Sequence, residues 1–354
     1  MTVSVRAARR RLAPDIVSAK DARACEAPVR IGVVGLGYWG PNLVRNLHEV
    51  AGAEVAWMCD LRRDMLDNLG RRFPAVRQTR DYRDVLADDS VDAVAVVTPV
   101  CTHFELAMEA LEAGKHVFVE KPLATSSDDA RHLIRAAFER GLVLMPGHTF
   151  LYSPPVTRIR DLIQSGELGE IYSISMSRVN LGLHQSDVSV VWDLGPHDFS
   201  ILLYWLSERP RRVVSLARAC IDGGTEDVAF IGCEFESGTI AHIELSWLAP
   251  SKLRRTTVVG SNKMVVYDDC SNEPVRVYDS GVVPRNPSSF GEFLKYRTGD
   301  IVSPHIPGIE PIALQMEDLC RAVRTGGTPR SSPHLGLEVV QMIEAVERSL
   351  LPQG

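Results

Sequence analysis

The chain has 354 residues, 45% of them hydrophobic and 24% charged, which is typical of a globular protein long enough to form two domains. Its net charge of −6 argues against nucleic acid or an anionic membrane as a partner, and no apolar run has the length of a membrane span. Seven cysteines without a Cys-x-x-Cys pair or metal-ligand spacing predict small buried thiols, no metal site and a reducing cytoplasm.

The first half of the chain alternates between strands and helices. Residues 1–28 are rich in arginine but lack the apolar segment of a signal peptide, so we expect a flexible extension outside the fold. Across residues 29–147 the strands are expected at VRIGVVG, AEVAWMCD, DAVAVVTP, HVFVE and LVLMPG, with a short one near 75–78. Strands of continuous apolar character between helices predict a doubly wound parallel sheet, the Rossmann arrangement, in an α/β protein.

The pattern changes from residue 148 onward. One helix near 155–165 precedes longer strands, and the stretch Thr239–Leu248 alternates apolar with polar residues, which is typical of antiparallel pairing with one buried face. A helix is expected over DLGPHDFSILLYWL, with Pro196 in its first turn, and two more between Pro311 and Leu351. Residues 148–354 are therefore predicted to form an α+β domain with a large open, mostly antiparallel sheet.

A dinucleotide site is predicted at GLGYWG, which follows the first strand and opens the first helix. In this G-x-G-x-x-G pattern Gly35 permits a tight turn, Gly37 lets a pyrophosphate approach, and Gly40 lets the helix pack on the strand. Such a pattern alone can be an ordinary glycine-rich turn. Asp60 ends the second strand twenty positions after Gly40 and completes the dinucleotide-binding context.

The identity of the dinucleotide depends on Asp60. A carboxylate there accepts both ribose hydroxyls and repels a 2′-phosphate, which favours NAD. Arg62 and Arg63 follow at once, and they leave NADP as the alternative. Because ligands of doubly wound sheets bind beyond the carboxyl ends of the strands, the rest of the site is expected to comprise Tyr38, Trp39, Thr98, Pro99, His103, Glu120, Lys121 and Pro122.

Lys121 is the first candidate for catalysis. It ends the strand HVFVE at the edge where the reactive end of the cofactor is expected. Oxidation of a secondary alcohol requires removal of the hydroxyl proton, and a partly desolvated amine can accept or supply that proton. The alternative is a lysine that pairs with Glu120 at the domain surface.

The second candidate set is Asp193 and His197 in WDLGPHDF. Four positions apart, they share one face of a helix. His197 is a natural acid/base group, and Asp193 would orient it or bind a substrate hydroxyl. In the alternative interpretation Asp193 caps the helix and His197 packs against its neighbours.

Four segments together resemble the Gfo/Idh/MocA oxidoreductase family: GLGYWGPN, THFELAMEALEAGKHVFVEKPL, GHTFLYSPPV and WDLGPHDFSILLYWL. The resemblance implies NAD or NADP, and a hydroxyl or keto carbon of a sugar, nucleotide sugar or cyclitol as the reacting group. It implies that Lys121 is the catalytic lysine, that Asp193 and His197 are its partners, and that Pro122 is a cis-proline.

The resemblance also points to finer expectations. The segments GLGYWGPN and SWLAPSKLRRTTVVG are most similar to the branch that acts on nucleotide-linked sugars, such as UDP-N-acetyl-hexosamine 3-dehydrogenases. Lys252, Arg254 and Arg255 would suit a diphosphate or else lie on a solvated or subunit-facing strand. The polar face of the second sheet is expected to form a homodimer or homotetramer. The expected substrate-binding residues are His148, Tyr152, Arg178 and Asn180 together with Asp193 and His197.

A non-enzymatic function remains as the second hypothesis, because the same fold can serve as an NAD-binding regulator. A regulator would be expected to have lost part of the acid/base set. Lys121, Asp193 and His197 are all present in the chain, so the sequence favours an enzyme.

Overall fold

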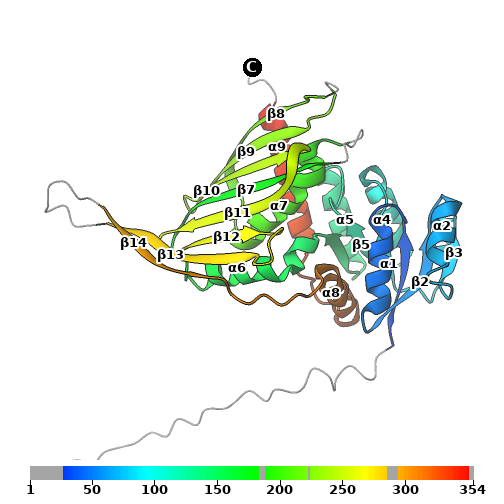
Figure 1. The fold of residues 1–354 in the computed structure, drawn as a ribbon. Helices are drawn as coiled ribbons and strands as arrows, with labels where there is room; N and C mark the ends of the chain where they lie inside the picture. Colours follow the sequence, from blue (N-terminus) through cyan, green and yellow to red (C-terminus); the bar gives the residue numbers. More distant parts are fainter. Residues whose placement is uncertain (1–26, 183–187, 222–223, 285–293, 351–354) are drawn as a thin grey trace, which may run out of the picture.

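The structure is a computed structural model that describes residues 27–182, 188–221, 224–284 and 294–350. The predicted flexible extension lies outside the described residues, except for its last two positions. Figure 1 shows two domains side by side, with the chain passing from the first to the second and returning near its end. Among the described residues, no helix is long and apolar enough to cross a membrane.

The first domain contains a six-stranded parallel sheet, as predicted, with strand order β3-β2-β1-β4-β5-β6. The chain order reverses between β1 and β4, which is the switch point where ligands of such sheets bind. Its central strands are buried on both faces. The strands are β1 Val29–Val34, β2 Ala53–Cys59, β3 Arg77–Thr79, β4 Ala93–Val96, β5 His116–Glu120 and β6 Leu144–Gly147.

Helices connect these strands and cover both faces of the sheet (Figure 1). Each amphipathic helix buries the side that bears leucine, valine or alanine, because only that side can leave water without losing hydrogen bonds. The connecting helices are α1 Gly40–Glu49, α2 Arg63–Gly70, α3 Tyr82–Leu86, α4 His103–Glu112 and α5 Ser127–Glu139, with a 3₁₀ turn η1 at Val100–Thr102.

The second domain contains an eight-stranded sheet of order β14-β13-β12-β11-β7-β10-β9-β8. The expected antiparallel pairing holds for every pair but one: β10 runs parallel to β7 and antiparallel to β9. The two last strands before the C-terminal helices, β13 and β14, were not predicted. The strands are β7 Ile171–Leu181, β8 Pro210–Arg218, β9 Val228–Phe235, β10 Ile240–Ser246, β11 Leu248–Gly260, β12 Met264–Asp268, β13 Val275–Pro284 and β14 Leu294–Val302.

One face of this sheet is covered by helices and the other is open (Figure 1). In β10 the residues Ala241, Ile243 and Leu245 are buried, whereas Ile240 and His242 are exposed, so the predicted alternation is confirmed. The helices of this half are α6 Pro154–Gln164, α7 Val190–Leu206, α8 Pro311–Thr325 and α9 Pro333–Leu350, with a 3₁₀ turn η2 at Thr149–Tyr152.

Helix α7 begins earlier than predicted. Its first residue is Val190, so Pro196 lies inside the helix and not in the first turn. Asp193 is already helical, and its N–H donates to the carbonyl of Ser189 over 3.0 Å. The alternative in which Asp193 caps the helix is therefore wrong.

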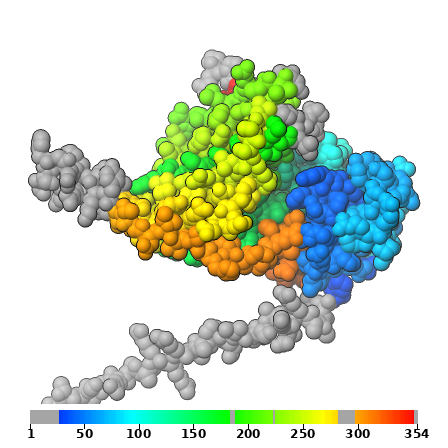
Figure 2. All heavy atoms as spheres, viewed as in Figure 1, coloured from blue at the N-terminus to red at the C-terminus, as the bar shows by residue number. Residues whose placement is uncertain are grey.

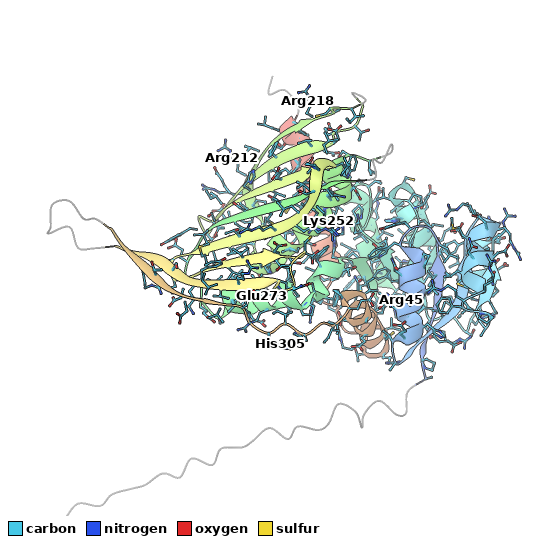
Figure 3. All side chains as sticks on the ribbon, viewed as in Figure 1. Arg45, Arg212, Arg218, Lys252, Glu273 and His305 are labelled. Carbon is cyan, nitrogen blue, oxygen red and sulfur yellow. The ribbon has the colours of Figure 1, made fainter. Side chains whose placement is uncertain are left out.

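The C-terminal helices return to the first domain. Helix α8 packs against α1, β1 and β2, while α9 lies between α5 of the first domain and α7 and β8 of the second. Arg45 on α1 forms an ion pair with Glu310, the residue before α8, with an Nη2–Oε1 distance of 2.5 Å. Figure 2 shows the segment between β14 and α8 running along the sheet to the first domain. Arg45 lies where this segment reaches the first domain (Figure 3).

Candidate active site

The glycine loop between β1 and α1 has the geometry that its sequence predicts. Gly35 has a φ of 94°, and a Cβ there would lie 2.5 Å from the carbonyl oxygen of Val97 on the neighbouring strand end. At Gly40 a Cβ would lie 2.3 Å from the carbonyl oxygen of Gly35. A Cβ at Gly37 would meet only Nη2 of Arg62, at 3.8 Å, so backbone does not crowd this position and a pyrophosphate could approach it.

Asp60 follows β2 and reaches back to the glycine loop. Its Oδ2 accepts a hydrogen bond from the N–H of Leu36 over 2.7 Å, and its Oδ1 accepts one from the N–H of Arg62 over 2.8 Å. The carboxylate is buried and held at the place where the adenosine ribose of a dinucleotide lies. The guanidinium of Arg62 is about half exposed and lies 3.4 Å from Oδ1, so Asp60 already neutralises part of the charge that a 2′-phosphate would need.

The ends of β4 and β5 lie next to each other beyond the glycine loop. Thr98 and Thr102 share a hydrogen bond of 2.7 Å that closes the turn after β4. Glu120 is buried, and burial raises the pKa of its carboxyl from an ordinary 4.5 to about 7. Its Oε2 accepts from the N–H of Lys121, whereas its Oε1 has no partner among the described residues.

His103 departs from the expected list of cofactor-binding residues. Its ring is buried at the start of α4, with Nδ1 at 2.8 Å from the carbonyl oxygen of Pro122 and Nε2 at 2.9 Å from that of Thr98. Both nitrogens therefore already face backbone carbonyls. The ring fixes the ends of β4 and β5 relative to each other and presents no free nitrogen to a cofactor.

Lys121 reaches from the first domain to Asp193 of the second. Its Nζ donates to the backbone carbonyl of Asp193 over 2.8 Å and lies 3.3 Å from the Oδ1 atom of the same residue. The Oδ2 atom of Asp193 accepts from the indole Nε1 of Trp247 over 3.2 Å. Lys121 thus pairs with Asp193 of the second domain and not with Glu120, and the bond to Pro122 is cis, as the resemblance implied.

His197 lies one turn after Asp193 on the same face of α7. Its Nδ1 is buried without a hydrogen-bond partner among the described residues. Burial, together with the nearby charges of Lys121, Arg178 and Arg254, holds the pKa of this imidazole well below its ordinary 6.5. His197 is therefore neutral at physiological pH.

His148 follows β6 and lies close to both Lys121 and His197. It is buried, neither ring nitrogen has a partner among the described residues, and burial lowers its pKa to about 3. Asn180 lies on β7 near the indole of Trp247, since both crowd the same point beside Gly182. The structure therefore brings Lys121, Asp193, His197, His148 and Asn180 into one region, and their role in substrate binding stays a prediction.

Arg178 has a different place from the one expected. It is buried on β7, and its Nε and Nη2 donate to the two carboxylate oxygens of Asp198 over 2.6 and 3.1 Å. Its Cζ lies 4.5 Å from the centre of the Phe150 ring. Two of its three nitrogens are thus committed within the protein, whereas its buried Nη1 has no hydrogen-bond partner among the described residues, so its role in substrate binding stays a prediction.

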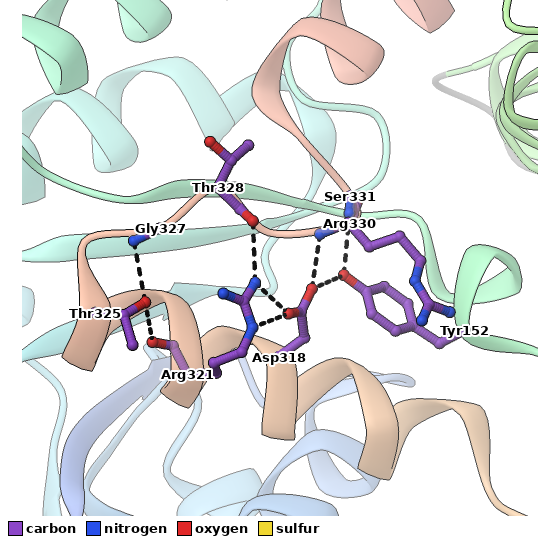
Figure 4. A network of polar contacts seen from close by, with 8 residues as sticks. All are labelled: Tyr152, Asp318, Arg321, Thr325, Gly327, Thr328, Arg330 and Ser331. Carbon is purple, nitrogen blue, oxygen red and sulfur yellow. Dashed lines mark hydrogen bonds and ion pairs between the residues drawn. The ribbon is translucent and has the colours of Figure 1, made fainter. Parts of the chain in front are cut away.

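Tyr152, another expected substrate residue, has its hydroxyl hydrogen-bonded within the protein. Its hydroxyl donates to Asp318 over 2.7 Å and accepts from the N–H of Ser331 over 3.0 Å, in a network with Arg321 and Arg330 (Figure 4). This network joins η2 to the segment between α8 and α9. The buried hydroxyl is occupied there and is not presented to a substrate.

Sequence reasoning missed several residues of the site. Trp247 lies 54 positions after its partner Asp193, and no spacing connects the two; Asp198 was missed as well. For Asp198 a signal existed, because it directly follows His197 in WDLGPHDF. Phe150 lay within GHTFLYSPPV but carried no chemical signal of its own.

The fold and the site define an NAD-binding oxidoreductase. Residues 29–148 match the oxidoreductase family with the NAD-binding Rossmann fold, and residues 156–266 match the Gfo/Idh/MocA C-terminal domain. The chain therefore belongs to the Gfo/Idh/MocA family.

The relatives of this chain are named for several different substrates. UDP-N-acetylglucosamine 3-dehydrogenase of Acidithiobacillus ferrooxidans is 27% identical over 78% of this chain and 86% of its own length. The scyllo-inositol 2-dehydrogenase (NAD(+)) of Bacillus subtilis is 26% identical over 86% of this chain and 89% of its own length. Among solved structures, GenD2 from gentamicin A biosynthesis, in complex with NAD, has a TM-score of 0.78 and 27% identity over 92% of this chain and 95% of that chain.

Proposed function

We propose that this oxidoreductase transfers a hydride between NAD and a hydroxyl or keto carbon of a sugar, and that the sugar is nucleotide-linked. The observation that carries the proposal is the meeting of Lys121 with Asp193, one turn from a neutral His197, at the end of the NAD-binding sheet. A proton-transfer pair at this position is what alcohol oxidation beside a nicotinamide requires.

The residues of the site have different roles in the proposed reaction. NAD, which the glycine loop and Asp60 would hold, would supply the acceptor for the hydride that leaves the carbon. His197, which is neutral, would accept the hydroxyl proton, while Lys121 would donate a hydrogen bond to the same oxygen. Asp193 holds Lys121 with two acceptor oxygens and is itself held by Trp247. In the reverse direction the reduced cofactor would supply the hydride, and His197 would return the proton to the keto oxygen.

A nucleotide-linked substrate is supported by Arg254. This residue is opposite Arg178 in the β7–β11 pair and is close enough to His197 to lower its pKa. Its Nη1 pairs with Asp269 at 3.2 Å, and its side chain is about one-third exposed, so it has donors left for a phosphate. Arg255 and Lys252 are exposed, and Arg255 occupies the alternate face of β11. The name of the Acidithiobacillus ferrooxidans relative agrees with this choice.

A cyclitol dehydrogenase is the second candidate. It is supported by the inositol dehydrogenase among the relatives and by the unpartnered nitrogens of His148, which suit the hydroxyls of a polyol. The two candidates differ in what Arg254 contributes. A cyclitol has no phosphate, so loss of this guanidinium would leave cyclitol oxidation nearly unchanged.

The test follows the absorbance of the nicotinamide band during a screen of UDP- and dTDP-linked sugars and of inositols, with NAD and NADP. We expect turnover with a nucleotide-linked sugar and NAD. Arg254→Gln should then raise the KM for that sugar at least about tenfold, the size of one lost charge-assisted contact. Turnover with inositols and none with nucleotide sugars would support the second candidate, and no turnover with any sugar would favour a regulator.

We also propose that the open face of the second sheet forms a homodimer or homotetramer interface. This face carries exposed apolar side chains on adjacent strands, including Leu216 on β8, Phe230 on β9 and Ile240 on β10. Arg212 and Glu234, a matched pair on the same face, would allow two copies to meet with opposite charges opposed. Exposed apolar patches of this kind mark association surfaces.

Light scattering at micromolar concentration tests this second proposal. We expect the mass of a dimer or tetramer for the native chain and a lower mass for Leu216→Arg. A monomeric native protein would refute the proposal.

A further inference from the structure

The orientation of the His197 ring has an unusual basis. An acid/base histidine commonly has one ring nitrogen held by a carboxylate or a carbonyl. In this chain Nδ1 of His197 has no such partner among the described residues, and Asp193 is occupied by Lys121 and Trp247. Packing must therefore fix the ring, because the helix fixes only its Cα–Cβ bond.

The packing partner is Phe150, from the 3₁₀ turn after β6. Its ring meets the imidazole edge to face, with centroids 5.1 Å apart and planes at 70°. The guanidinium carbon of Arg178 lies 4.5 Å from the centre of the same phenyl ring. The imidazole, the phenyl ring and the guanidinium therefore form one continuous contact.

Asp198 holds the guanidinium of Arg178, the group at the other end of this row of contacts from His197. It is the residue after His197 on α7, and both of its oxygens accept from Arg178. Both partners of this ion pair are less than one-tenth exposed. The two hydrogen bonds fix the plane of the guanidinium, which fixes the phenyl ring against which the imidazole rests.

We infer that the Arg178–Asp198 ion pair, acting through the ring of Phe150, positions His197 for proton transfer. The inference rests on the proposed function, in which His197 accepts the proton. The pair does not itself contact the reacting oxygen, so Arg178, Asp198 and Phe150 are positioning residues. Besides Arg178, the other charged or titratable groups near His197 are Lys121 after β5, His148 after β6 and Arg254 on β11.

Two changes break the contact at different points. Phe150→Leu removes the ring and keeps the apolar volume, and the double change R178M/D198L removes the ion pair without leaving a lone buried charge. Each should lower kcat by about 10²-fold, the cost of a misplacement on the order of 1 Å, with the KM for the sugar within about threefold. Phe150→Tyr keeps a ring and should restore kcat to within about threefold of the native value. R209M/E338L removes an exposed pair elsewhere and should have no effect.

A measurement without substrate separates this inference from the proposed function. The carbon-bound protons of the His197 ring, assigned by their absence in His197→Asn, feel the phenyl ring in the NMR spectrum. Their resonances should move in Phe150→Leu and in R178M/D198L but stay in R209M/E338L. Unmoved resonances, or a kcat near the native value in both folded variants, would overturn the inference. A chain inactive toward all sugars that still shows these shifts would instead contradict the proposed function alone.

Discussion

The two domains hold their functional groups in different ways. In the first domain, backbone geometry does most of the positioning: the glycine loop makes a tight turn that tolerates no side chain at Gly35 or Gly40, and Asp60 is held by two backbone N–H groups. In the second domain, side chains position side chains, through Trp247 on Asp193 and Arg178 on Asp198. The difference teaches that a local sequence pattern can encode the first arrangement, whereas long-range strand pairing builds the second.

Lys121 joins the two domains at the candidate site, so its replacement should have the largest effect on turnover. Lys121→Met keeps the apolar stem and removes the amine that donates to Asp193. We expect kcat to fall by about 10³-fold, within the range that general acid/base groups contribute, while NAD affinity changes only a few-fold. Stopped-flow turnover and NAD titration measure the two quantities. Full turnover in this variant would mean that His197 acts without the lysine.

The buried Glu120 of the first domain should make the free energy of unfolding depend on pH. Its folded-state pKa of about 7 is above the ordinary 4.5, so the folded state retains the proton over this interval. The resulting stabilisation is complete below pH 4.5 and is lost as the pH rises through 7, with a total of about 3 kcal/mol.

Glu120→Gln carries no titratable proton at this position. Its unfolding free energy should exceed that of the native chain at pH 8 by up to about 3 kcal/mol and approach the native value near pH 5. Urea unfolding at the two pH values measures the difference. A difference that is independent of pH would show that the carboxyl does not titrate near neutrality.

Asp60 is expected to determine the preference for NAD over NADP. Asp60→Asn keeps an oxygen for the N–H groups of Leu36 and Arg62 but removes the negative charge. Repulsion of a 2′-phosphate then disappears, while Arg62 remains nearby. We expect the ratio of NAD to NADP affinity to fall by about tenfold, which corresponds to about 1.4 kcal/mol. Fluorescence titration with both reduced cofactors measures the ratio, and an unchanged ratio would remove Asp60 as the selector.

The smallest effect is expected away from the candidate site. Arg45 and Glu310 join the two domains at the surface, with their side chains about one-third exposed or more. Exposed pairs of this kind contribute at most about 1 kcal/mol. Arg45→Met should therefore lower the unfolding free energy by less than about 1 kcal/mol and leave turnover unchanged, as measured by urea unfolding and steady-state kinetics. A larger loss of unfolding free energy would show that this ion pair contributes substantially to the association of the two domains.

The sequence predicted what depends on local chemistry. The parallel sheet followed from continuous apolar strands, and the glycine loop followed from three glycines whose positions tolerate no side chain or need open space. The one parallel pair in the second sheet, β7 with β10, was not predicted because alternation reports which face is buried and not the direction of a neighbour.

Several polar groups expected in the candidate site are already hydrogen-bonded within the protein, for one physical reason. Tyr152 and Arg178 looked available because the sequence shows polar groups but not their partners. Their partners, Asp318 and Asp198, are 166 and 20 positions away and are met only when the domains fold. His103 likewise lost both ring nitrogens to carbonyls of neighbouring strand ends.

Helix α9 belongs to both domains at once. Glu344 accepts from the N–H of Ser127 at the start of α5 over 2.6 Å, and Glu347, one turn later, accepts from the indole of Trp192 on α7 over 2.6 Å. Because α9 packs on both domains, unfolding of either domain removes the contacts of this helix with the other. The chain should accordingly unfold in a single cooperative transition, with calorimetric and van't Hoff enthalpies equal, despite its two separate sheets.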